Sequence, residues 1–447
     1  MAAEPSNPPA CALHLPAELH YECIRCGRSC GEFWEIPVDS REAERIRSLA
    51  PDSLGPAGAA DPRDALVENP WSPGTLMMRQ AGGRCGLQRA DGLCALHAAH
   101  GLAAKPNICQ SFPYKFIETP GGVFVGLSFA CTAVLGDLGP AVSEQSAEIE
   151  ALYPFTHSRR RVTEPLTLTE DLPLSWSQYA QVEDDLAAIL DPAHGPIGQR
   201  LIMQSIYLRL LIQFLRESRK QGGTMLAGPE ANDAVLAVFR RRLRGPAEDP
   251  WPLPRRLAQR RGPSPLLRRM FLGVAHALRN TYGERRGRLG SYRSIFGAYF
   301  LWAVGRGALD LPALGRPIAY ARLRRIGLDA AQPEFDRLLT RYFRHRLFRK
   351  ELLLGDSIQM THHLQLLHWG LIAWYGTALA ADAGADEVGL EHLREAVRNV
   401  EKYYVFHSTF DRLFGRHPIL RAFLERIFEH PLYAYSMGYD ERVKGEG

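Results

Sequence analysis

Cysteine is the residue type whose spacing most clearly indicates chemistry in this chain of 447 residues. Cys23, Cys26 and Cys30 form a C-x2-C-x3-C run, and Gly27 lets the backbone turn so that the three sulfurs can converge on one centre. Four further cysteines follow before a long stretch that has none: Cys85, Cys94, Cys109 and Cys131. Seven of the eight cysteines therefore lie between positions 23 and 131, and this clustering predicts a metal centre.

Clustered cysteines can have roles other than metal ligation. In a reducing compartment they are metal ligands or redox groups more often than they form disulfides. They can also be small, buried core residues without a metal. Cys11 lies in a proline-rich stretch and is expected to be a bystander.

A histidine adds an eighth candidate ligand. A helix is predicted for residues 93–102, and Cys94 and His97 are three residues apart and share one face of it, whereas His100 points elsewhere. Seven thiolates and His97 would fill two tetrahedral zinc sites; alternatively, four thiolates hold an iron–sulfur cluster and the others are structural. The first choice of ligands for one centre is Cys23, Cys26, Cys30 and Cys109.

Short elements are expected to position these side chains. Residues 33–38 alternate like a strand, and Asp39 with Ser40 offers N-cap residues to a helix ending near Leu49. The proline-, glycine- and alanine-rich residues 51–73 are predicted to form a loop.

A β-hairpin is predicted for residues 115–129, because two apolar, β-prone runs flank the turn 120–122. Cys131 follows its second strand, and Pro106 and Pro113 restrict the backbone on either side of Cys109. The fold class expected is therefore mainly α, with a small, irregular α+β cysteine-rich metal-binding domain (21–135) before a large helical region.

Residues 136–447 show mostly helical patterns. Two short strands are expected at 166–174, followed by a helix that Ser175 and Gln178 cap together. Further helices are predicted at 198–220, 266–278, 292–304, 333–354, 357–381, 390–404 and 419–430. Prolines make 240–265 an Arg/Pro-rich linker or surface loop, and 1–20 is expected to be a disordered tail.

The net charge of +5 is unevenly distributed. Residues 239–293 contain 15 arginines and three acids, about +12 by subtraction. Such a segment faces an anionic partner or is a solvated surface. No zinc-finger spacing or RNP-like run accompanies it, so nucleic-acid binding is not expected.

Other features limit the classes of protein. The N-terminus lacks a basic and an apolar signal region, so the chain is expected in the cytoplasm. Residues 364–381 are predicted to form a buried helix and not a membrane span. His362, His363 and His368 are expected to be packed or surface residues, as is the run 403–407. Nucleotide-binding, Walker and hydrolase motifs are absent from the sequence.

The order of the cysteine motifs resembles a known family. The matching residues are Cys23-x2-Cys26-Gly27-x2-Cys30, Trp34, Asp39, Cys85, Asp91-Gly92-x-Cys94 and Lys105-Pro106-x2-Cys109-x2-Phe112-Pro113. Over about residues 21–133 the chain resembles the CxxCxxCC cysteine-cluster family. These YkgJ-type proteins are described as zinc- or iron-chelating, and their relatives include the flagellin lysine-N-methylase FliB.

The resemblance also implies an activity. FliB-like relatives join a similar cysteine-rich domain to a mostly helical region. They are associated with an iron–sulfur cluster and with S-adenosylmethionine-dependent methylation of protein lysines. This chain departs from the family at Ser29, where the pattern has a cysteine. Because a serine hydroxyl is a poor ligand for a soft metal, one site has lost a thiolate or uses His97 instead.

Two hypotheses from different classes follow. In the first, the chain is an iron–sulfur-dependent protein lysine N-methyltransferase whose helical region binds a protein substrate. In the second, it is a non-catalytic zinc- or iron-binding module whose helical region binds a partner protein. Metal binding is common to both hypotheses.

Overall fold

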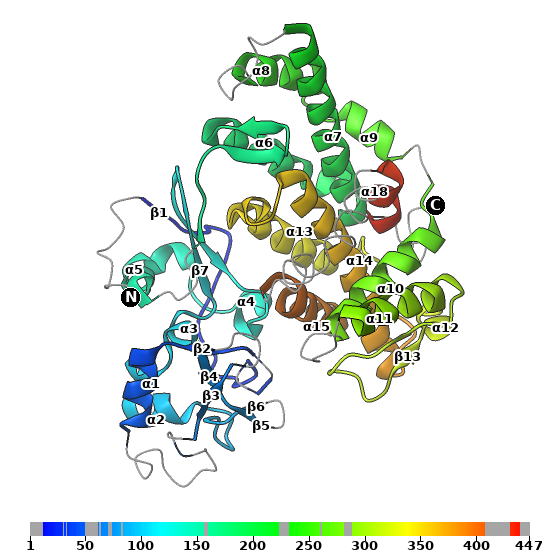
Figure 1. Ribbon diagram of the computed structural model, residues 1–447. Helices are drawn as coiled ribbons and strands as arrows, with labels where there is room; N and C mark the ends of the chain where they lie inside the picture. Colours follow the sequence, from blue (N-terminus) through cyan, green and yellow to red (C-terminus); the bar gives the residue numbers. More distant parts are fainter. Residues whose placement is uncertain are drawn as a thin grey trace. The chain divides into compact units, whose positions relative to one another are not determined.

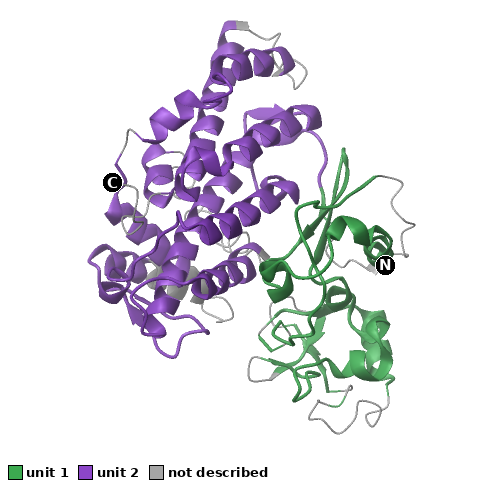
Figure 2. Ribbon diagram, turned by 180° about the vertical axis from the view of Figure 1, so that it is seen from behind, with its two compact units in different colours: residues 1–161 green, residues 162–447 purple. Residues whose placement is uncertain are grey.

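The computed structural model describes residues 12–29, 31–32, 34–49, 61, 64–69, 74–81, 84–155, 160–222, 232–259, 262–280, 288–406 and 430–438. Three features of the sequence analysis lie outside these residues: Cys11, Cys30 of the first cysteine motif, and most of the predicted helix 419–430. The chain divides into two compact units, Met1–Arg161 and Val162–Gly447 (Figure 2). The fold is mainly α, with small sheets.

A four-stranded sheet organises part of unit 1. Its order is β1 (Leu13–His14), β8 (Gly122–Leu127), β7 (Tyr114–Thr119) and β9 (Arg160–Arg161). The antiparallel hairpin β7–β8 confirms the predicted one. At the two edges of the sheet, β1 pairs in parallel with β8, and β9 pairs in parallel with β7.

The expected disordered tail is wrong for its last residues. Leu13 pairs with Val123, and the ring of His14 stacks on Phe124 with centroids 4.3 Å apart. Leu19 is buried as well. Apolar packing and strand pairing therefore order residues whose local composition predicted disorder.

The other elements of unit 1 are short. They are β2 (Pro37–Val38), α1 (Ser40–Arg47), β3 (Leu66–Glu68), β4 (Leu76–Met78), β5 (Gln80–Ala81), β6 (Arg84–Cys85), α2 (Ala95–His100), η2 (Leu102–Ala104), α3 (Asn107–Ser111), α4 (Thr132–Gly136), η3 (Val142–Gln145), α5 (Ser146–Leu152) and η4 (Tyr153–Phe155) (Figure 1). Asp39 caps α1 as predicted, in a reciprocal capping box with Glu42. The predicted loop 51–73 is wrong at β3, which pairs with β4 because Leu66 is buried there.

Helices make up most of unit 2. After the antiparallel strands β10 (Leu166–Thr169) and β11 (Leu172–Leu174), the predicted Ser175–Gln178 capping box begins α6 (Trp176–Ile189). The following elements are η5 (Pro192–His194), α7 (Ile197–Gly222), α8 (Asn232–Leu243), α9 (Pro252–Ala258), α10 (Pro265–Asn280), α11 (Arg288–Ala303), β12 (Ala308–Leu309), β13 (Ile318–Ala319), α12 (Tyr320–Leu323), α13 (Pro333–Phe348), η7 (Glu351–Leu353), α14 (Ile358–Asp382), α15 (Leu390–Val400), the π-helix η8 (Glu401–Phe406) and α18 (Pro431–Gly438).

Helix α14 lies at the centre of unit 2, in contact with α7, α10, α15 and α18 (Figure 1). Most of its side chains are buried, as predicted for residues 364–381. Among the described helices, none is sufficiently long and apolar to traverse a lipid bilayer.

The prediction of an irregular proline-rich linker is wrong at α9. Pro252 stands in its first turn and Pro254 two residues later. The first N–H groups of a helix have no partner within the helix, so proline costs little there and its fixed φ favours the helical start. The predicted helix 333–354 also ends early, at Phe348, before Lys350 takes a left-handed conformation with φ 56°.

Candidate metal centre

Helix starts hold two of the predicted ligands. Cys131 is the N-cap of α4, and Cys94 is the N-cap of α2. The predicted helix 93–102 is shorter than expected, because α2 covers Ala95–His100 and Cys94 is its N-cap, just before its first turn. Cys94 forms a β-bridge with Gln88, which keeps its backbone extended (φ −79°, ψ 124°) and places the helix start after it.

The other predicted ligands lie in loops and short elements. Cys23 and Cys26 are exposed, in the segment between β1 and β2. Cys85 ends β6, and Cys109 lies in α3; both are partly buried. Cys30, the third sulfur of the first motif, lies outside the described residues.

A close backbone contact joins the first cysteine motif to the second. Gly27 has φ +65°, and a Cβ on it would overlap the carbonyl group of Gly92, which itself has φ +82°. The side-chain amide of Gln88 fastens the contact, because its Nε2 donates to the carbonyl oxygens of Gly27 (2.7 Å) and Gly92 (2.9 Å). Glycines are thus required on both sides of this junction. The role of Gln88 was not predicted, and no sequence motif signals it.

Cys131 is brought to the first motif by the fold. Its thiol is buried, and its pKa is raised to about 11. Burial is the main cause of the rise, and the nearby charges of Cys26 and Cys23 add to it. Hydrogen bonds from the backbone N–H groups of Val134 and Ala133 oppose it. The fold therefore brings Cys131 close enough to Cys26 and Cys23 for their charges to act on its thiol, although more than 100 residues separate Cys131 from the other two.

Tyr21 completes this group. Burial raises the pKa of its hydroxyl, and the charges of Cys131 and Cys23 add to the rise; Tyr21 also forms a hydrogen bond with Cys23. Its ring contacts that of Tyr114 edge to face, with centroids 5.4 Å apart. Sequence analysis missed Tyr21, whose only signal is its place two residues before the first cysteine.

His97 faces basic groups. Partial burial lowers its pKa, and the positive charges of Lys105 and Arg25 lower it further. Arg25 lies between Cys23 and Cys26, so the first motif extends toward α2. A neutral imidazole is the form that binds metals.

The described residues do not themselves form a complete metal site. Among them, no group of three or more His, Cys, Asp or Glu side chains stands in a metal-binding arrangement. Cys131 lies near Cys23 and Cys26, and metal ligation by these three stays a prediction, as it does for Cys85, Cys94, Cys109 and His97.

Aromatic side chains from the family-like motifs pack together nearby. The rings of Trp34 and Phe112 meet edge to face, with centroids 5.8 Å apart, and Trp34 is buried. Phe112 follows Cys109 by three residues, so this contact links α3 to the segment that follows the first motif.

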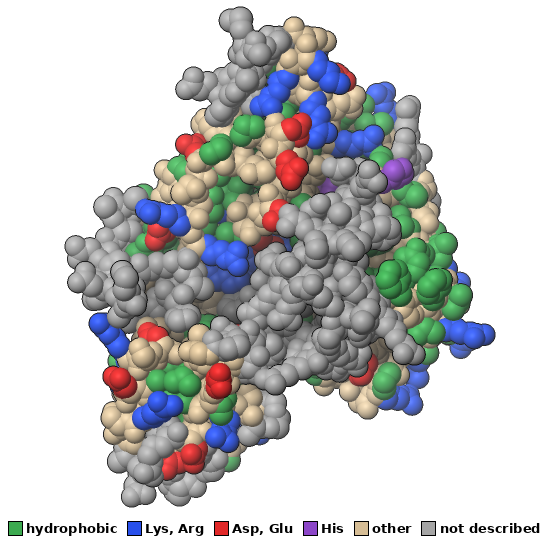
Figure 3. Space-filling model, in the orientation of Figure 1, with side chains coloured by type: hydrophobic (Ala, Val, Ile, Leu, Met, Phe, Trp, Pro, Cys, Tyr) green, Lys and Arg blue, Asp and Glu red, His purple; other side chains and the backbone are tan. Residues whose placement is uncertain are grey.

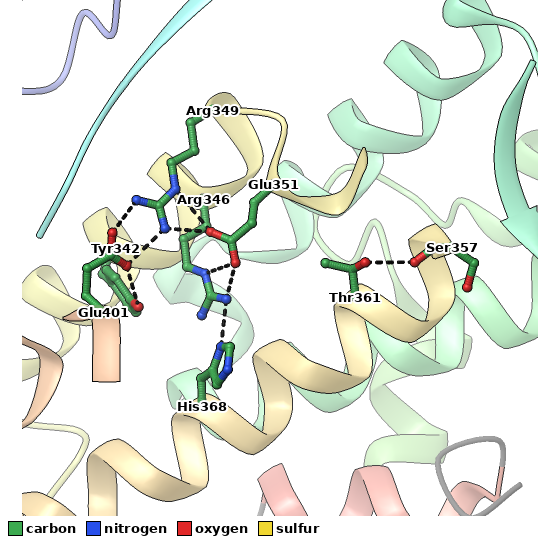
Figure 4. A network of polar contacts seen from close by, with 8 residues as sticks. All are labelled: Tyr342, Arg346, Arg349, Glu351, Ser357, Thr361, His368 and Glu401. Carbon is green, nitrogen blue, oxygen red and sulfur yellow. Dashed lines mark hydrogen bonds and ion pairs between the residues drawn. The ribbon is translucent and has the colours of Figure 1, made fainter. Parts of the chain in front are cut away.

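A second polar cluster lies inside unit 2 (Figure 4). Arg349 donates to both oxygens of Glu401, at 2.6 and 3.0 Å, and to Glu351 at 2.5 and 3.1 Å. Arg346 donates from Nε to Glu351 at 2.9 Å and contacts Nδ1 of His368 at 2.8 Å. All five side chains are buried, and the four charges sum to zero.

This buried cluster has a structural explanation. It fixes η7 and η8 against α13, and Tyr342 adds a hydrogen bond to Glu401 at 3.1 Å. Burial lowers the pKa of His362, His363 and His368, so all three are neutral at pH 7. They are packed core residues, which is one of the two roles expected for them.

Arginines of the segment 239–293 bind groups within unit 2. Arg240 donates to both oxygens of Asp185, at 2.7 and 2.9 Å, and Arg244 contacts the same carboxylate at 2.5 Å. Arg268 donates to the backbone of Ser436 at 3.1 Å. Figure 3 also shows Lys and Arg side chains beside Asp and Glu over α7 and α8. Part of the segment's charge is therefore balanced internally.

Comparisons of the chain with models of known families, with curated proteins and with solved structures find no match.

Proposed function

We propose that unit 1 is a metal-binding module in which Cys23, Cys26 and Cys131 bind a zinc or iron centre. The observation that supports the proposal is the proximity of Cys131 to Cys23 and Cys26, which lie more than 100 residues away in the sequence and whose charges act on its buried thiol. Cys30, His97, Cys109, Cys85 and Cys94 are the further candidate ligands.

The donors fit a thiophilic metal. Thiolates are soft ligands that suit zinc, and also iron in iron–sulfur clusters. A buried thiol whose pKa is raised to about 11 is protonated at pH 7, and a bound cation would offset the repulsion between the three sulfurs. Metal binding should therefore release protons, and its affinity should increase with pH.

The backbone around the thiols is shaped for this role. The Gly27–Gly92 contact and the two hydrogen bonds from Gln88 hold the first motif against the segment that carries Cys85 and Cys94. A bound metal would add folding free energy to unit 1, on the order of 10 kcal/mol for a structural zinc at neutral pH.

Lysine N-methylation stays a prediction from the resemblance. As the resemblance implies it, this activity uses an iron–sulfur cluster and S-adenosylmethionine. Measurements of metal content and methyl-transfer assays test it. The alternative is a non-catalytic module in which the metal stabilises the fold and unit 2 binds a partner protein.

Metal analysis of the full chain, purified without oxygen, tests the proposal. Zinc, iron and acid-labile sulfide are measured in the natural chain and in Cys23→Ser, Cys131→Ser and Cys11→Ser. We expect the first two variants to lose a metal and Cys11→Ser to keep it. A chain that binds neither zinc nor iron, or a Cys131→Ser variant with unchanged metal content and affinity, would refute the proposal. Iron with sulfide would favour the methyltransferase, and zinc alone would favour the structural module.

A further inference from the structure

One side of α11, together with Val304 in the turn that follows it, leaves large apolar side chains in solvent. Phe296, Phe300, Leu301 and Val304 are 60%, 65%, 52% and 67% exposed. Their spacing of i, i+4, i+5 and i+8 places them along one side of the helix, and we call them the apolar stripe. Contiguous exposed apolar surface of this kind marks an interaction site more often than scattered apolar residues do.

Trp302 anchors the last turn of α11, next to the stripe. α11 lies against α10 (Figure 1). Trp302, one residue from Leu301 in sequence, is 3% exposed and packs against Trp374, with the two rings tilted by 31° and their centroids 4.5 Å apart. Its ring also contacts Tyr320 at 5.8 Å.

A basic segment adjoins the stripe. Residues 306–325 contain five arginines and one aspartate, a net charge of +4, and all six side chains belong to exposed residues: Arg306, Asp310, Arg316, Arg322, Arg324 and Arg325. One backbone contact joins this segment to α11: the N–H of Arg306 donates to the carbonyl oxygen of Leu301 at 2.8 Å. Within the segment, the N–H of Tyr320 donates to the carbonyl oxygen of Gly307 at 2.9 Å.

We propose that the apolar stripe and this basic segment together dock onto the surface of an anionic lipid bilayer. Phenylalanine, leucine and valine on one helix face enter the headgroup boundary, and neighbouring arginines bind anionic headgroups. The protein would lie on the bilayer without crossing it.

The charge distinguishes this occupant from a second copy of the chain. An isologous dimer through the stripe would bring two segments of charge +4 together, and like charges oppose association. A negatively charged surface is attracted by the same arginines, and this attraction weakens as salt screens it. The bilayer therefore satisfies both the apolar and the basic parts of the surface.

A glycine offers a variant that should strengthen docking. Gly297 is exposed, and a Cβ on it meets nothing within 4 Å. Its position, three residues before Phe300 and seven before Val304, places it on the face of the stripe. Gly297→Trp adds apolar surface there, and its Cβ has room on the exposed backbone.

Vesicle flotation of the full chain tests the proposal. Vesicles of phosphatidylcholine alone are compared with vesicles of phosphatidylcholine and phosphatidylglycerol in a ratio of about three to one. We expect binding to the anionic vesicles only. Phe300→Ser with Val304→Ser should weaken it roughly a hundredfold, Arg324→Gln with Arg325→Gln about fivefold per arginine, and Gly297→Trp should strengthen it. Val238→Ser, an exposed apolar residue of α8, is the control and should bind unchanged.

Several results would overturn the proposal. The proposal fails if the natural chain does not float with anionic vesicles, or if the stripe variant binds them as well as the natural chain does while thermal unfolding shows that every variant is folded. Light scattering that finds a dimer, dissociated by Phe300→Ser with Val304→Ser, would assign the stripe to a second copy instead. A stripe-dependent complex with an acidic protein, without vesicle binding, would assign it to a protein partner.

Discussion

Replacing Glu401 with Gln is expected to destabilise the helical unit by about 3 to 5 kcal/mol. Glu401 is fully buried and accepts two hydrogen bonds from Arg349 and one from Tyr342. Glutamine keeps the volume but removes the negative charge. The cluster of Arg346, Arg349 and Glu351 then carries a net positive charge in the interior, where an unpaired charge is costly.

A matched control separates burial from charge. Glu391 also pairs with an arginine, Arg394, at 2.5 Å, but its side chain is 80% exposed. Glu391→Gln is expected to change stability by less than about 0.5 kcal/mol, because exposed ion pairs are screened by water and salt. Both variants carry the same chemical change on helical segments of the same unit.

Urea unfolding at pH 7, followed by circular dichroism, measures the two losses of stability. A double variant, Glu401→Gln with Arg349→Met, removes one charge of each sign and restores neutrality. It should be more stable than Glu401→Gln alone, which a double-mutant cycle quantifies. The reasoning is refuted if Glu401→Gln costs no more than Glu391→Gln, or if removing Arg349 as well makes the loss simply additive.

Further predictions concern the glycine junction and pH. Gly27→Ala should lower the stability of unit 1 by more than about 2 kcal/mol, because the added Cβ would overlap Gly92. Gly74→Ala is the control: it is also at positive φ but has nothing within 4 Å, and it should lower the stability by about 1 kcal/mol. Equal shifts of the two variants in thermal unfolding would contradict the role of the Gly27–Gly92 contact. Burial lowers the pKa of His363 from 6.5 to about 4. The unfolded chain therefore binds more protons at this residue between those pH values, and His363 alone should lower the stability by roughly 2 kcal/mol from pH 7 to pH 5. His362 and His368, whose pKa values burial also lowers, add to this fall. His363→Gln should reduce this slope, and an unchanged slope in urea titrations would exclude the assignment.

Acid should also weaken the buried ion cluster. Burial alone would raise the pKa of Glu351, but the charges of Arg346 and Arg349, with their hydrogen bonds, outweigh it and hold the pKa well below its usual value of 4.5. For a carboxyl with a depressed pKa, the stabilisation is present above the unfolded-state value and declines as the pH falls below it. Stability should thus continue to fall below about pH 4.5 after the histidine contribution has been lost.

Local patterns in the sequence predicted the elements that depend on neighbouring residues. The hairpin β7–β8, the capping boxes at Asp39 and Ser175, and the buried character of α14 were all predicted, because spacing and residue type act over a few residues. Errors occurred where a tertiary contact overrode composition. Leu13 pairs with β8 in a segment whose composition predicted disorder, and prolines begin α9 in a segment predicted to be irregular.

The sequence by itself therefore determined that the chain is mainly helical and that its thiols gather in one N-terminal region. Only the tertiary structure decided which of them meet: it brings Cys131 to Cys23 and Cys26 and adds Tyr21 beside them. It also placed Glu401 against Arg349 inside unit 2. The physical reason is that these contacts join residues separated by about 50 to 110 positions, and the period of a helix or strand carries no information over that distance.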